Sequence, residues 1–468
     1  MRQTSAAWLA EKAGAKLCGD PNAQVLNVKI DSREVCPGDM FVCVVGEIND
    51  GHRFAENAWH QGCRVFLMSE RETAKKLLSL GGDTCVILTE DTNIAFRDMA
   101  AAYLAQFSVR KLAITGSVGK TSTRTFAAAI LAEKYRTISS QKNLNTHLGL
   151  CLTCFLADET TEVMVFEMGM DRKGEIAEYV DWVRPEMAVI TNVGITHLEK
   201  LGTRDAIANA KLEITNHFGA DNLLICNADS DYLNDEEIRR RTAGRDFSIF
   251  YVGTGEDADL QLADAKPSGA GVRFSLRHGQ DVQEFYLPLL GVHNAIDAAL
   301  AAALGLQLGV DLKTASVGLS KVKPNPRRMD ARLLSGVLLI DDTYNASPDS
   351  MAAALDVLDG LSASRKIAVL ADMLELGDAE EEGHRRIGKR LAASSVDKLY
   401  AIGPRAKMYA GEAEGTPGLS IRWAEKLEEL EQAILADLRE GDAVLIKGSN
   451  VTGVADLAER MRAKLEEK

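Results

Sequence analysis

A glycine-rich stretch that ends in a lysine carries the strongest chemical signal in this sequence. It reads KLAITGSVGKTSTRTF, so an apolar strand runs into Gly116 and a helix opens after Gly119 at Lys120. Glycines let the backbone fold so tightly that its N–H groups face phosphate oxygens, and a helix N-terminus adds positive potential. The alternative is a glycine-rich turn with a chance lysine. The strand before the loop and the helix after it favour nucleotide binding.

The loop residues predict how the phosphates of ATP would be held. Lys120 would reach the outer phosphates, and the Thr121 hydroxyl would bind Mg²⁺. Ile114 stands where the general pattern GxxxxGK[ST] has its first glycine, so the spacing here is the shorter GxxGKT. The residues expected to contact ATP in this loop are Gly116, Ser117, Val118, Gly119, Lys120, Thr121 and Ser122.

Two further strands end near groups that could hold the metal ion accompanying a triphosphate. The strand EVMVFEM carries Glu167 at its end, and TNVGITHLEKLGT places His197 beyond the carboxyl end of the next strand. Ligands bind at this edge of open α/β sheets, and Mg²⁺ prefers oxygen ligands with some water retained. The alternatives are a strand-terminal acid that is merely solvated and a histidine satisfied within the fold.

Charge and composition exclude several classes of protein. The chain is 46% hydrophobic and 26% charged, which is ordinary for a globular protein, and its formal charge of -14 disfavours nucleic-acid binding. We find neither a run of roughly 18 apolar residues nor an apolar signal-peptide region. The eight cysteines are too sparse for a disulfide framework, and Cys151 and Cys154 form a CxxC in an apolar helical stretch. We therefore expect a reduced, cytoplasmic protein.

Strand and helix signals divide the 468 residues into three predicted domains of the α/β class. Residues 1–105 form a small α/β domain. Residues 106–322 hold the phosphate loop, a doubly wound, mainly parallel sheet and a β-rich extension, which a long alanine-rich helix closes. The hinge KVKPNPRRMD leads into residues 323–468, where strands and helices alternate again as a second Rossmann-like unit.

The order of several motifs resembles one enzyme family over nearly the whole chain. GSVGKTS, FEMGM, TNVGITHLEKLG, AKLEI and GVHNAIDAALAAA are similar to the central domain of Mur ligases, which share the short glycine spacing with folylpolyglutamate synthetases. DSREVCPGDMFV and GEINDGHRF fit the first domain of that family. IDDTYNASPDSMAAAL and LADMLELG resemble the third domain of its D-alanyl-D-alanine-adding members. Each string alone is weak, but their ordered combination is specific.

The resemblance implies an activity and its substrates. It implies an ATP-dependent, amide-bond-forming ligase of peptidoglycan synthesis, which joins D-alanyl-D-alanine to UDP-MurNAc-tripeptide through an acyl phosphate. The first domain would bind UDP-MurNAc, and the third would bind the incoming dipeptide and part of ATP. The resemblance also implies a monomer that binds small molecules, with no nucleic acid and no membrane insertion.

The resemblance assigns roles to residues that spacing alone does not single out. Two Mg²⁺ ions would be held by Thr121, Glu167, His197 and Lys211, the last as a carbamate formed with carbon dioxide. The implied catalytic residues are Lys120, Lys211, His197 and Arg328. The implied ATP contacts outside the loop are Asn294, Arg328, Asp342, Tyr344 and Asn345. The implied substrate contacts are Ser32, Arg33, His52, Asn145, Thr146 and Lys447.

Three positions depart from the family pattern. Arg327, Ser347 and Asn450 stand where glycine, asparagine and arginine are usual. The hinge string PNPR is similar to the DNPR motif of diaminopimelate-adding members, but it lacks the aspartate and precedes the third-domain core, so we interpret it as a coincidence. A diaminopimelate-adding or folylpolyglutamate synthetase-like ligase is the alternative within the class. A P-loop kinase or motor ATPase and a non-catalytic nucleotide-binding scaffold are the alternatives outside it.

Overall fold

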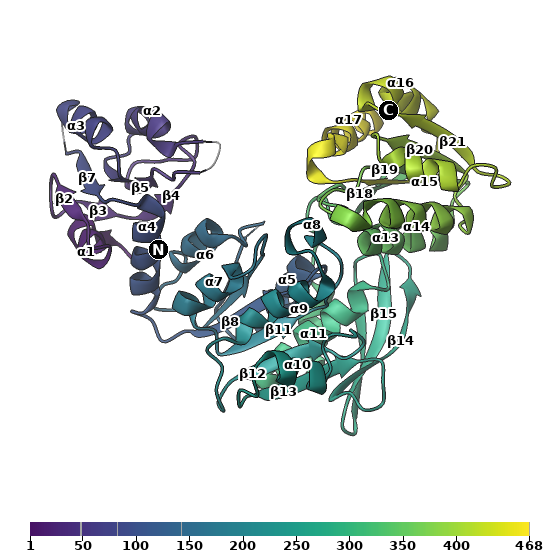
Figure 1. Ribbon diagram of the computed structural model, residues 1–468, viewed down its shortest axis with the longest axis horizontal. Helices are drawn as coiled ribbons and strands as arrows, with labels where there is room; N and C mark the ends of the chain where they lie inside the picture. Colours follow the sequence, from purple (N-terminus) through teal and green to yellow (C-terminus); the bar gives the residue numbers. More distant parts are fainter. Residues whose placement is uncertain (47–48, 82, 142, 468) are drawn as a thin grey trace. The chain divides into compact units, whose positions relative to one another are not determined.

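The computed structural model describes residues 1–46, 49–81, 83–141 and 143–467 (Figure 1). Glu47 and Ile48, within the motif GEINDGHRF, lie outside the described residues. The chain forms two compact units, which are Met1–Ile114 with Lys134–Met170 and Glu178–Met187, and Thr115–Glu133 with Asp171–Ala177 and Ala188–Lys468. The division at residues 105 and 322 stays a prediction. No helix within these described stretches is long and apolar enough to cross a membrane.

The N-terminal part of the first unit contains two small sheets. Strand β1 pairs with β3, and the second sheet has the order β2-β7-β6-β5-β4, in which β2 is antiparallel and the others are parallel. Ser5 is the N-cap residue of α1, and its hydroxyl accepts a hydrogen bond from Trp8 N at 3.2 Å. The elements are β1 (Thr4–Ser5), α1 (Ala6–Lys12), β2 (Lys16–Cys18), β3 (Gln24–Val25), β4 (Asn27–Lys29), β5 (Asp39–Val42), η1 (Gly51–Phe54), α2 (Ala55–His60), β6 (Val65–Met68), α3 (Arg71–Ser79), β7 (Cys85–Leu88) and α4 (Thr92–Leu104).

The phosphate loop follows β8, the first strand of a parallel group in the middle of the chain. In the first unit the order is β8-β10-β9, all parallel, with Glu167 opposite Ile114 in the register of β10 against β8. These elements are β8 (Arg110–Thr115), β9 (Thr137–Ser139), α6 (His147–Cys154), β10 (Val163–Glu167) and α7 (Glu175–Val183). Both cysteines of the CxxC are buried on α6, where burial raises their pKa, as expected for a structural role.

The second unit continues the α/β pattern and then adds antiparallel strands. Its strand order is β16-β15-β14-β13-β12-β11, in which β12, β13 and β14 pair in parallel and β14 to β16 pair antiparallel. The predicted β-rich extension is therefore present, although β14 was not predicted. The elements are α5 (Lys120–Leu131), β11 (Met187–Ile190), α8 (Leu198–Leu201), α9 (Arg204–Leu212), η2 (Glu213–Thr215), β12 (Leu223–Asn227), α10 (Asp235–Arg241), β13 (Ser248–Gly253), β14 (Leu260–Ser268), β15 (Gly271–His278), β16 (Asp281–Leu287), α11 (Asn294–Gln307) and α12 (Leu312–Ser320).

A six-stranded sheet forms the last part of the second unit. Its order is β17-β18-β22-β19-β20-β21, and all neighbours are parallel except β17, an antiparallel edge strand that follows the hinge. The elements are β17 (Asp330–Leu334), β18 (Val337–Asp342), α13 (Pro348–Gly360), β19 (Arg365–Ala371), η3 (Gly377–Ala379), α14 (Glu380–Ala392), β20 (Lys398–Ile402), α15 (Ala406–Glu412), β21 (Ser420–Ala424), α16 (Leu427–Asp437), β22 (Asp442–Lys447), η4 (Asn450–Thr452) and α17 (Val454–Glu466).

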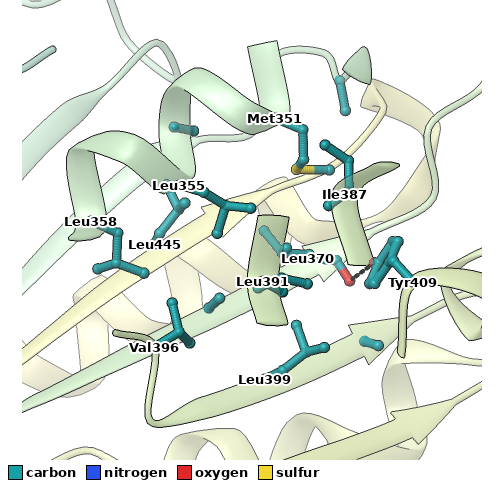
Figure 2. Packing of buried hydrophobic residues seen from close by; sticks show 14 of the residues in the cluster. Met351, Leu355, Leu358, Leu370, Ile387, Leu391, Val396, Leu399, Tyr409 and Leu445 are labelled. Atoms are coloured by element: carbon teal, nitrogen blue, oxygen red, sulfur yellow. Dashed lines mark hydrogen bonds between the residues drawn. The ribbon is translucent and has the colours of Figure 1, made fainter. Parts of the chain in front are cut away.

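Two apolar cores hold this sheet between its helices. Helices α13, α14 and α15 cover one face, where Leu355, Leu391 and Leu445 are fully buried (Figure 2). Helices α16 and α17 cover the other face. Each fully buried leucine contributes roughly 1.5–3 kcal/mol. The Tyr409 hydroxyl donates to the Leu370 carbonyl at 2.6 Å, so its polar atom is satisfied inside the core. The carboxyl ends of the parallel strands are thereby held at a fixed edge.

Candidate nucleotide and carboxylate site

The phosphate loop turns sharply between β8 and α5, and two glycines make the turn possible. Gly116 has a φ of 154°, and a side chain there would collide with the Thr191 hydroxyl. Gly119 has a φ of 83° and is the N-cap residue of α5, so it has no side chain that could cap the helix. A helix N-terminus that a glycine begins leaves room for an anion beside its first amide groups.

The residues after β11 brace the loop from the neighbouring strand. Asn192 accepts from Ser117 N through its carbonyl (3.1 Å) and from Val118 N through Oδ1 (3.1 Å). Its Nδ2 and the Thr191 hydroxyl both donate to the Val118 carbonyl, and Gly194 N donates to Ser117 Oγ at 2.8 Å. The loop is thus held in shape by the strand end TNVG. Sequence reasoning missed Asn192 as a positioning residue, and the available signal was an amide directly after a buried strand.

Lys120 lies folded over the loop that precedes it. Its ammonium donates to the Gly116 carbonyl at 2.7 Å and to the Ser117 carbonyl at 3.1 Å. Thr121, 4% exposed, and Ser122 follow it in the first turn of α5. An ammonium directly above a glycine-rich turn suits the binding of phosphate oxygens, which would accept from it in place of the carbonyls. All seven loop residues therefore belong to one local structure, as predicted.

Lys211 is buried near the end of α9. It is 1% exposed, and burial first and the charge of Lys120 second lower its pKa well below the ordinary value. Desolvation disfavours the charged ammonium, so a buried lysine gives up its proton more readily than an exposed one. A neutral amine is the form that attacks carbon dioxide. The structure thus shows that Lys211, which looks like an ordinary helix lysine in the sequence, is buried and has a lowered pKa.

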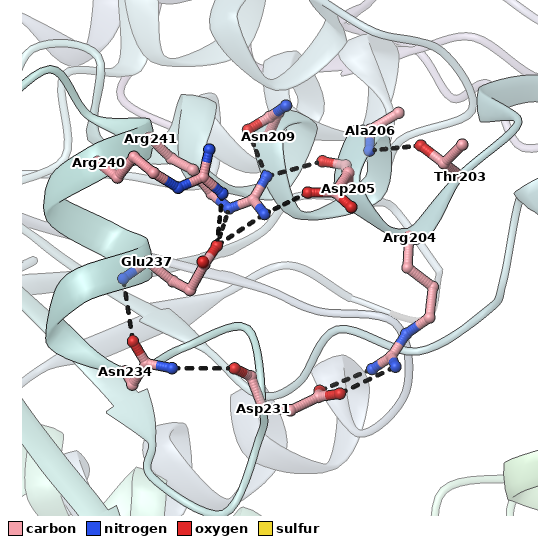
Figure 3. A network of polar contacts seen from close by, with 10 residues as sticks. All are labelled: Thr203, Arg204, Asp205, Ala206, Asn209, Asp231, Asn234, Glu237, Arg240 and Arg241. Carbon is pink, nitrogen blue, oxygen red and sulfur yellow. Dashed lines mark hydrogen bonds and ion pairs between the residues drawn. The ribbon is translucent and has the colours of Figure 1, made fainter.

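A network of ion pairs anchors the helix that carries this lysine (Figure 3). The guanidinium of Arg241 bonds both Asp205 and Asn209, which lie on α9, and its side chain is 3% exposed. Arg204 at the start of α9 forms a two-pronged pair with Asp231, at 2.7 and 2.9 Å. A planar guanidinium that makes two parallel bonds fixes the orientation of its partner in addition to pairing with its charge. The network therefore sets the position of α9 against α10.

His197 lies between two carboxylates of the second unit. Its Nδ1 is 3.3 Å from Asp171 Oδ1 and 3.3 Å from Glu375 Oε2. The backbone of His197 has a φ of 63°. Neither contact has hydrogen-bond geometry, and Nδ1 has no other partner within the described residues. The role of His197 as a metal ligand stays a prediction. Across the residues that the structure describes, no three His, Cys, Asp or Glu side chains gather closely enough to hold a metal ion.

Glu167 and Asn145, both predicted site residues, meet in the first unit. Glu167 ends β10, is 1% exposed, and accepts from Asn145 Nδ2 at 2.9 Å. The Asn145 carbonyl accepts from Gly169 N at 2.8 Å, so the asparagine holds the end of β10 at two points. Thr146 follows as the N-cap residue of α6. The structure therefore brings the predicted metal ligand beside a predicted substrate contact.

Three predicted residues of the C-terminal sheet form one cluster at its carboxyl edge. Lys447 Nζ lies 2.6 Å from Asp342 Oδ2 and donates to the Asn345 carbonyl at 2.8 Å. The Lys447 side chain is 3% exposed and that of Asp342 is 13% exposed, so this ion pair is largely buried. Asp342 also accepts from Met329 N at 3.1 Å. Sequence reasoning named these residues but did not predict that they would bind one another.

The hinge carries the predicted Arg328 and one of the three unusual residues. The Arg328 guanidinium lies 3.8 Å from the centre of the Tyr344 ring, which is cation–π geometry. Arg327 donates to the Thr343 carbonyl at 2.8 Å and to Asn450 Oδ1 at 2.6 Å. Two departures from the family pattern, Arg327 and Asn450, are therefore direct partners.

The third departure has a local explanation. Ser347 is the N-cap residue of α13, with Pro348 after it, and forms a reciprocal capping box with Ser350. Its hydroxyl accepts from Ser350 N, and the Ser350 hydroxyl accepts from Ser347 N at 2.9 Å. Serine is a preferred N-cap residue, so the change preserves the start of the helix. In α11, Asn294 likewise fixes its own helix start, because Nδ2 donates to the Leu290 carbonyl at 2.8 Å.

Of the three predicted contacts to UDP, Ser32 and Arg33 lie in a loop of the first unit, and His52 lies in the 3-10 helix η1. Arg33 is highly exposed and pairs with Asp31, and Ser32 Oγ accepts from Asn57 Nδ2 at 3.3 Å. His52 is 5% exposed; its Nδ1 contacts Asp50 at 2.6 Å and its Nε2 accepts from Ser69 N at 2.9 Å. Both ring nitrogens of His52 are therefore used within the fold. A contact of these residues with UDP stays a prediction.

Comparison with known proteins assigns this arrangement to a family. The Mur ligase family catalytic domain matches residues 24–111, the Mur ligase middle domain matches 114–305, and the Mur ligase glutamate ligase domain matches 327–450. The chain belongs to the Mur ligase family. A UDP-N-acetylmuramoyl-tripeptide--D-alanyl-D-alanine ligase of Bacillus subtilis (strain 168) is 35% identical over 429 residues, covering 90% of each chain.

Solved structures of Mur ligases agree with the sequence match. The crystal structure I of MurF from Acinetobacter baumannii has a TM-score of 0.86 at 28% identity and covers 100% of both chains. The MurF ligase of Thermotoga maritima in complex with ADP has a TM-score of 0.78 at 27% identity, covering 94% of this chain and 98% of that one. A diaminopimelate ligase and a folylpolyglutamate synthase, at 19% and 20% identity, show the shared Mur ligase fold alone. The predicted fold class is confirmed.

Proposed function

We propose that this chain is an ATP-dependent ligase that joins D-alanyl-D-alanine to UDP-N-acetylmuramoyl-tripeptide. The observation that carries the proposal is the phosphate loop Gly116–Ser122 together with Lys211, a buried lysine of lowered pKa in the same unit. A kinase or motor ATPase needs the loop but has no evident use for such a lysine. The named relatives that match over most of their length support the choice of substrates.

ATP would be held by the residues that the sequence selects. The loop amides and Lys120 would take the phosphates, because they lie around one tight turn at a helix N-terminus. Asn294, Arg328, Asp342, Tyr344 and Asn345 would contribute the remaining ATP contacts. Support for nucleotide binding comes from the solved MurF of Thermotoga maritima, which is in complex with ADP.

Mg²⁺ fits the donor groups of the chain if phosphate and water complete its coordination. When bound, it would supply charge neutralisation for the phosphates and the reacting carboxylate. Thr121, Glu167, His197 and Lys211 would hold it. The neutral Lys211 amine would attack carbon dioxide, forming an N–C bond and releasing one proton, and the resulting carbamate would be an anion. A lysine with a lowered pKa favours that reaction at neutral pH.

The reaction would proceed in two steps. The tripeptide carboxylate attacks the γ-phosphoryl group of ATP, so that an acyl phosphate forms and ADP is displaced. The free amine of the dipeptide then attacks the activated carbonyl, and phosphate leaves. A carboxylate and an amine do not condense unaided, so ATP supplies the leaving group. Lys120 and Arg328 would position the reacting groups and neutralise the charge of the phosphates. We place this activity in the cytoplasm, in a monomer, with UDP-MurNAc bound by the first domain through Ser32, Arg33 and His52.

A phosphate-release assay tests the proposal. The protein is mixed with ATP, Mg²⁺ and UDP-MurNAc-tripeptide, carrying either lysine or diaminopimelate, with or without D-alanyl-D-alanine. We expect sustained phosphate release only with both co-substrates, and a new amide product by mass spectrometry. Phosphate release from ATP alone would favour a motor ATPase, and product formation with glutamate or diaminopimelate instead of the dipeptide would favour another ligase.

A further inference from the structure

A buried carboxyl group lies directly beneath the phosphate loop. Asp297 is on α11, one turn after Asn294, and it is 5% exposed. A Cβ atom built on Gly119 would lie 2.3 Å from Asp297 Oδ1 and 2.7 Å from Oδ2. Gly119 is therefore needed for two reasons, its positive φ and the space that the Asp297 carboxyl occupies. In the sequence this aspartate is conspicuous only as an interruption of an alanine- and leucine-rich run.

Burial governs the charge of this carboxyl. It raises the pKa of Asp297 to about 8, and the Thr123 hydroxyl lowers it less strongly. Thr123 Oγ1 lies buried with no partner of hydrogen-bond geometry in the described part of the chain, so we regard burial as the deciding influence. A pKa near 8 leaves roughly nine in ten molecules protonated at pH 7 and about one in ten at pH 9.

Among the residues that the structure describes, no charged group is a cause that offsets this effect. Helix α11 packs against α5, α12, β12, β13, β14 and β15. The titratable groups on these elements are Lys120, Arg124, Cys226, Tyr251, Asp264, Lys266, Arg273, Arg277, His278 and Lys313. None of them is among the causes that shift the pKa of Asp297, which are burial and the Thr123 hydroxyl.

We propose that Asp297 is a positioning residue for nucleotide binding, which supports Gly119 from below as an uncharged carboxylic acid. The neutral group fills the space under the turn without placing a negative charge beside the phosphates. Ionisation would put an anion behind the loop in a medium of low polarity, where it repels the nucleotide. By linkage, a bound nucleotide makes ionisation of Asp297 less favourable. This inference rests on the proposed nucleotide function of the loop.

Binding of ADP at different pH values tests the inference without turnover. The dissociation constant of MgADP is measured between pH 7 and pH 9 for the wild type, Asp297→Asn and the exposed control Asp281→Asn. Asparagine has nearly the same shape and cannot ionise. We expect the dissociation constant of the wild type and of Asp281→Asn to rise roughly tenfold over this range, following the loss of the proton. That of Asp297→Asn should change less than about twofold.

Three results would overturn the inference. Equal pH dependence in the wild type and Asp297→Asn would show that another group titrates. A folded Asp297→Asn that no longer binds MgADP at pH 7 would show that the carboxylate itself is required. An infrared difference spectrum of the wild type could show that no protonated carboxyl is lost between pH 7 and pH 9. That result would show, independently of any variant, that Asp297 does not titrate in this range. Failure of the wild type to bind MgADP at pH 7 would instead refute the proposed nucleotide site.

Discussion

Replacing Asp297 with asparagine should stabilise the second unit, and the gain should grow with pH. The carboxyl has a pKa of about 8 in the folded chain against an ordinary value of 3.8. Below pH 3.8 the carboxyl is mostly protonated in both the folded and the unfolded chain, so its ionisation does not lower the free energy of unfolding. Between pH 4 and pH 8 the unfolded chain is ionised while the folded chain keeps the proton, so unfolding releases a proton and stability falls as pH rises. Asparagine does not titrate, so the stability of Asp297→Asn does not fall with pH for this reason.

The size of the effect follows from the difference in pKa. Each pH unit inside the window lowers the free energy of unfolding of the wild type by about 1.4 kcal/mol relative to a residue that does not ionise. Between pH 5 and pH 7 the advantage of Asp297→Asn should therefore grow by roughly 2–3 kcal/mol. The carboxyl is buried and has no charged partner among the causes of its shift, so little of this value is lost to solvent screening.

Hydrogen exchange of the α11 segment is a suitable measurement, because a chain with several domains need not unfold in one transition. The opening free energy of peptides from Asn294–Gln307 is compared between the wild type and Asp297→Asn at pH 5 and pH 7, after correction for intrinsic exchange. The exposed Asp281→Asn serves as the matched control and should show no pH-dependent difference. If the advantage of Asp297→Asn is the same at both pH values, the carboxyl is ionised in the fold and the reasoning fails.

Other predictions follow from single contacts. Lys120→Ala should lower kcat by at least about 10²–10³-fold in the phosphate-release assay, since it removes the cation above the loop, and near-normal turnover would exclude its phosphate role. Lys211→Ala should be inactive and regain part of its activity when a short carboxylic acid is added, whereas full activity without the acid would remove the carbamate from the mechanism. Arg327→Ala and Asn450→Ala should show a coupling of about 0.5–1 kcal/mol in a double-mutant cycle of unfolding, because the two side chains are 2.6 Å apart. Additive effects of the two substitutions would mean that the two side chains do not stabilise each other.

Local patterns were sufficient to predict much of the fold. The strand at 111–115 was found as β8 (Arg110–Thr115) and the alanine-rich helix as α11 (Asn294–Gln307), because apolar runs bounded by turn residues mark buried elements. The short strand β9 and the edge strand β17 were not predicted. Their side chains are partly exposed, with little apolar patterning, so their pairing depends on neighbours distant in sequence.

The amino-acid sequence by itself determined the chemistry of the phosphate loop, since tight turns, an adjacent lysine and a helix N-terminus are all local consequences of residue order. It also determined the family, because an ordered set of motifs is a property of the chain alone. The tertiary structure decided the lowered pKa of Lys211 and the raised pKa of Asp297. It also decided the ion pair of Lys447 with Asp342 and the contact of Arg327 with Asn450. Burial and charge depend on residues that lie far away in sequence, and only folding brings them within reach.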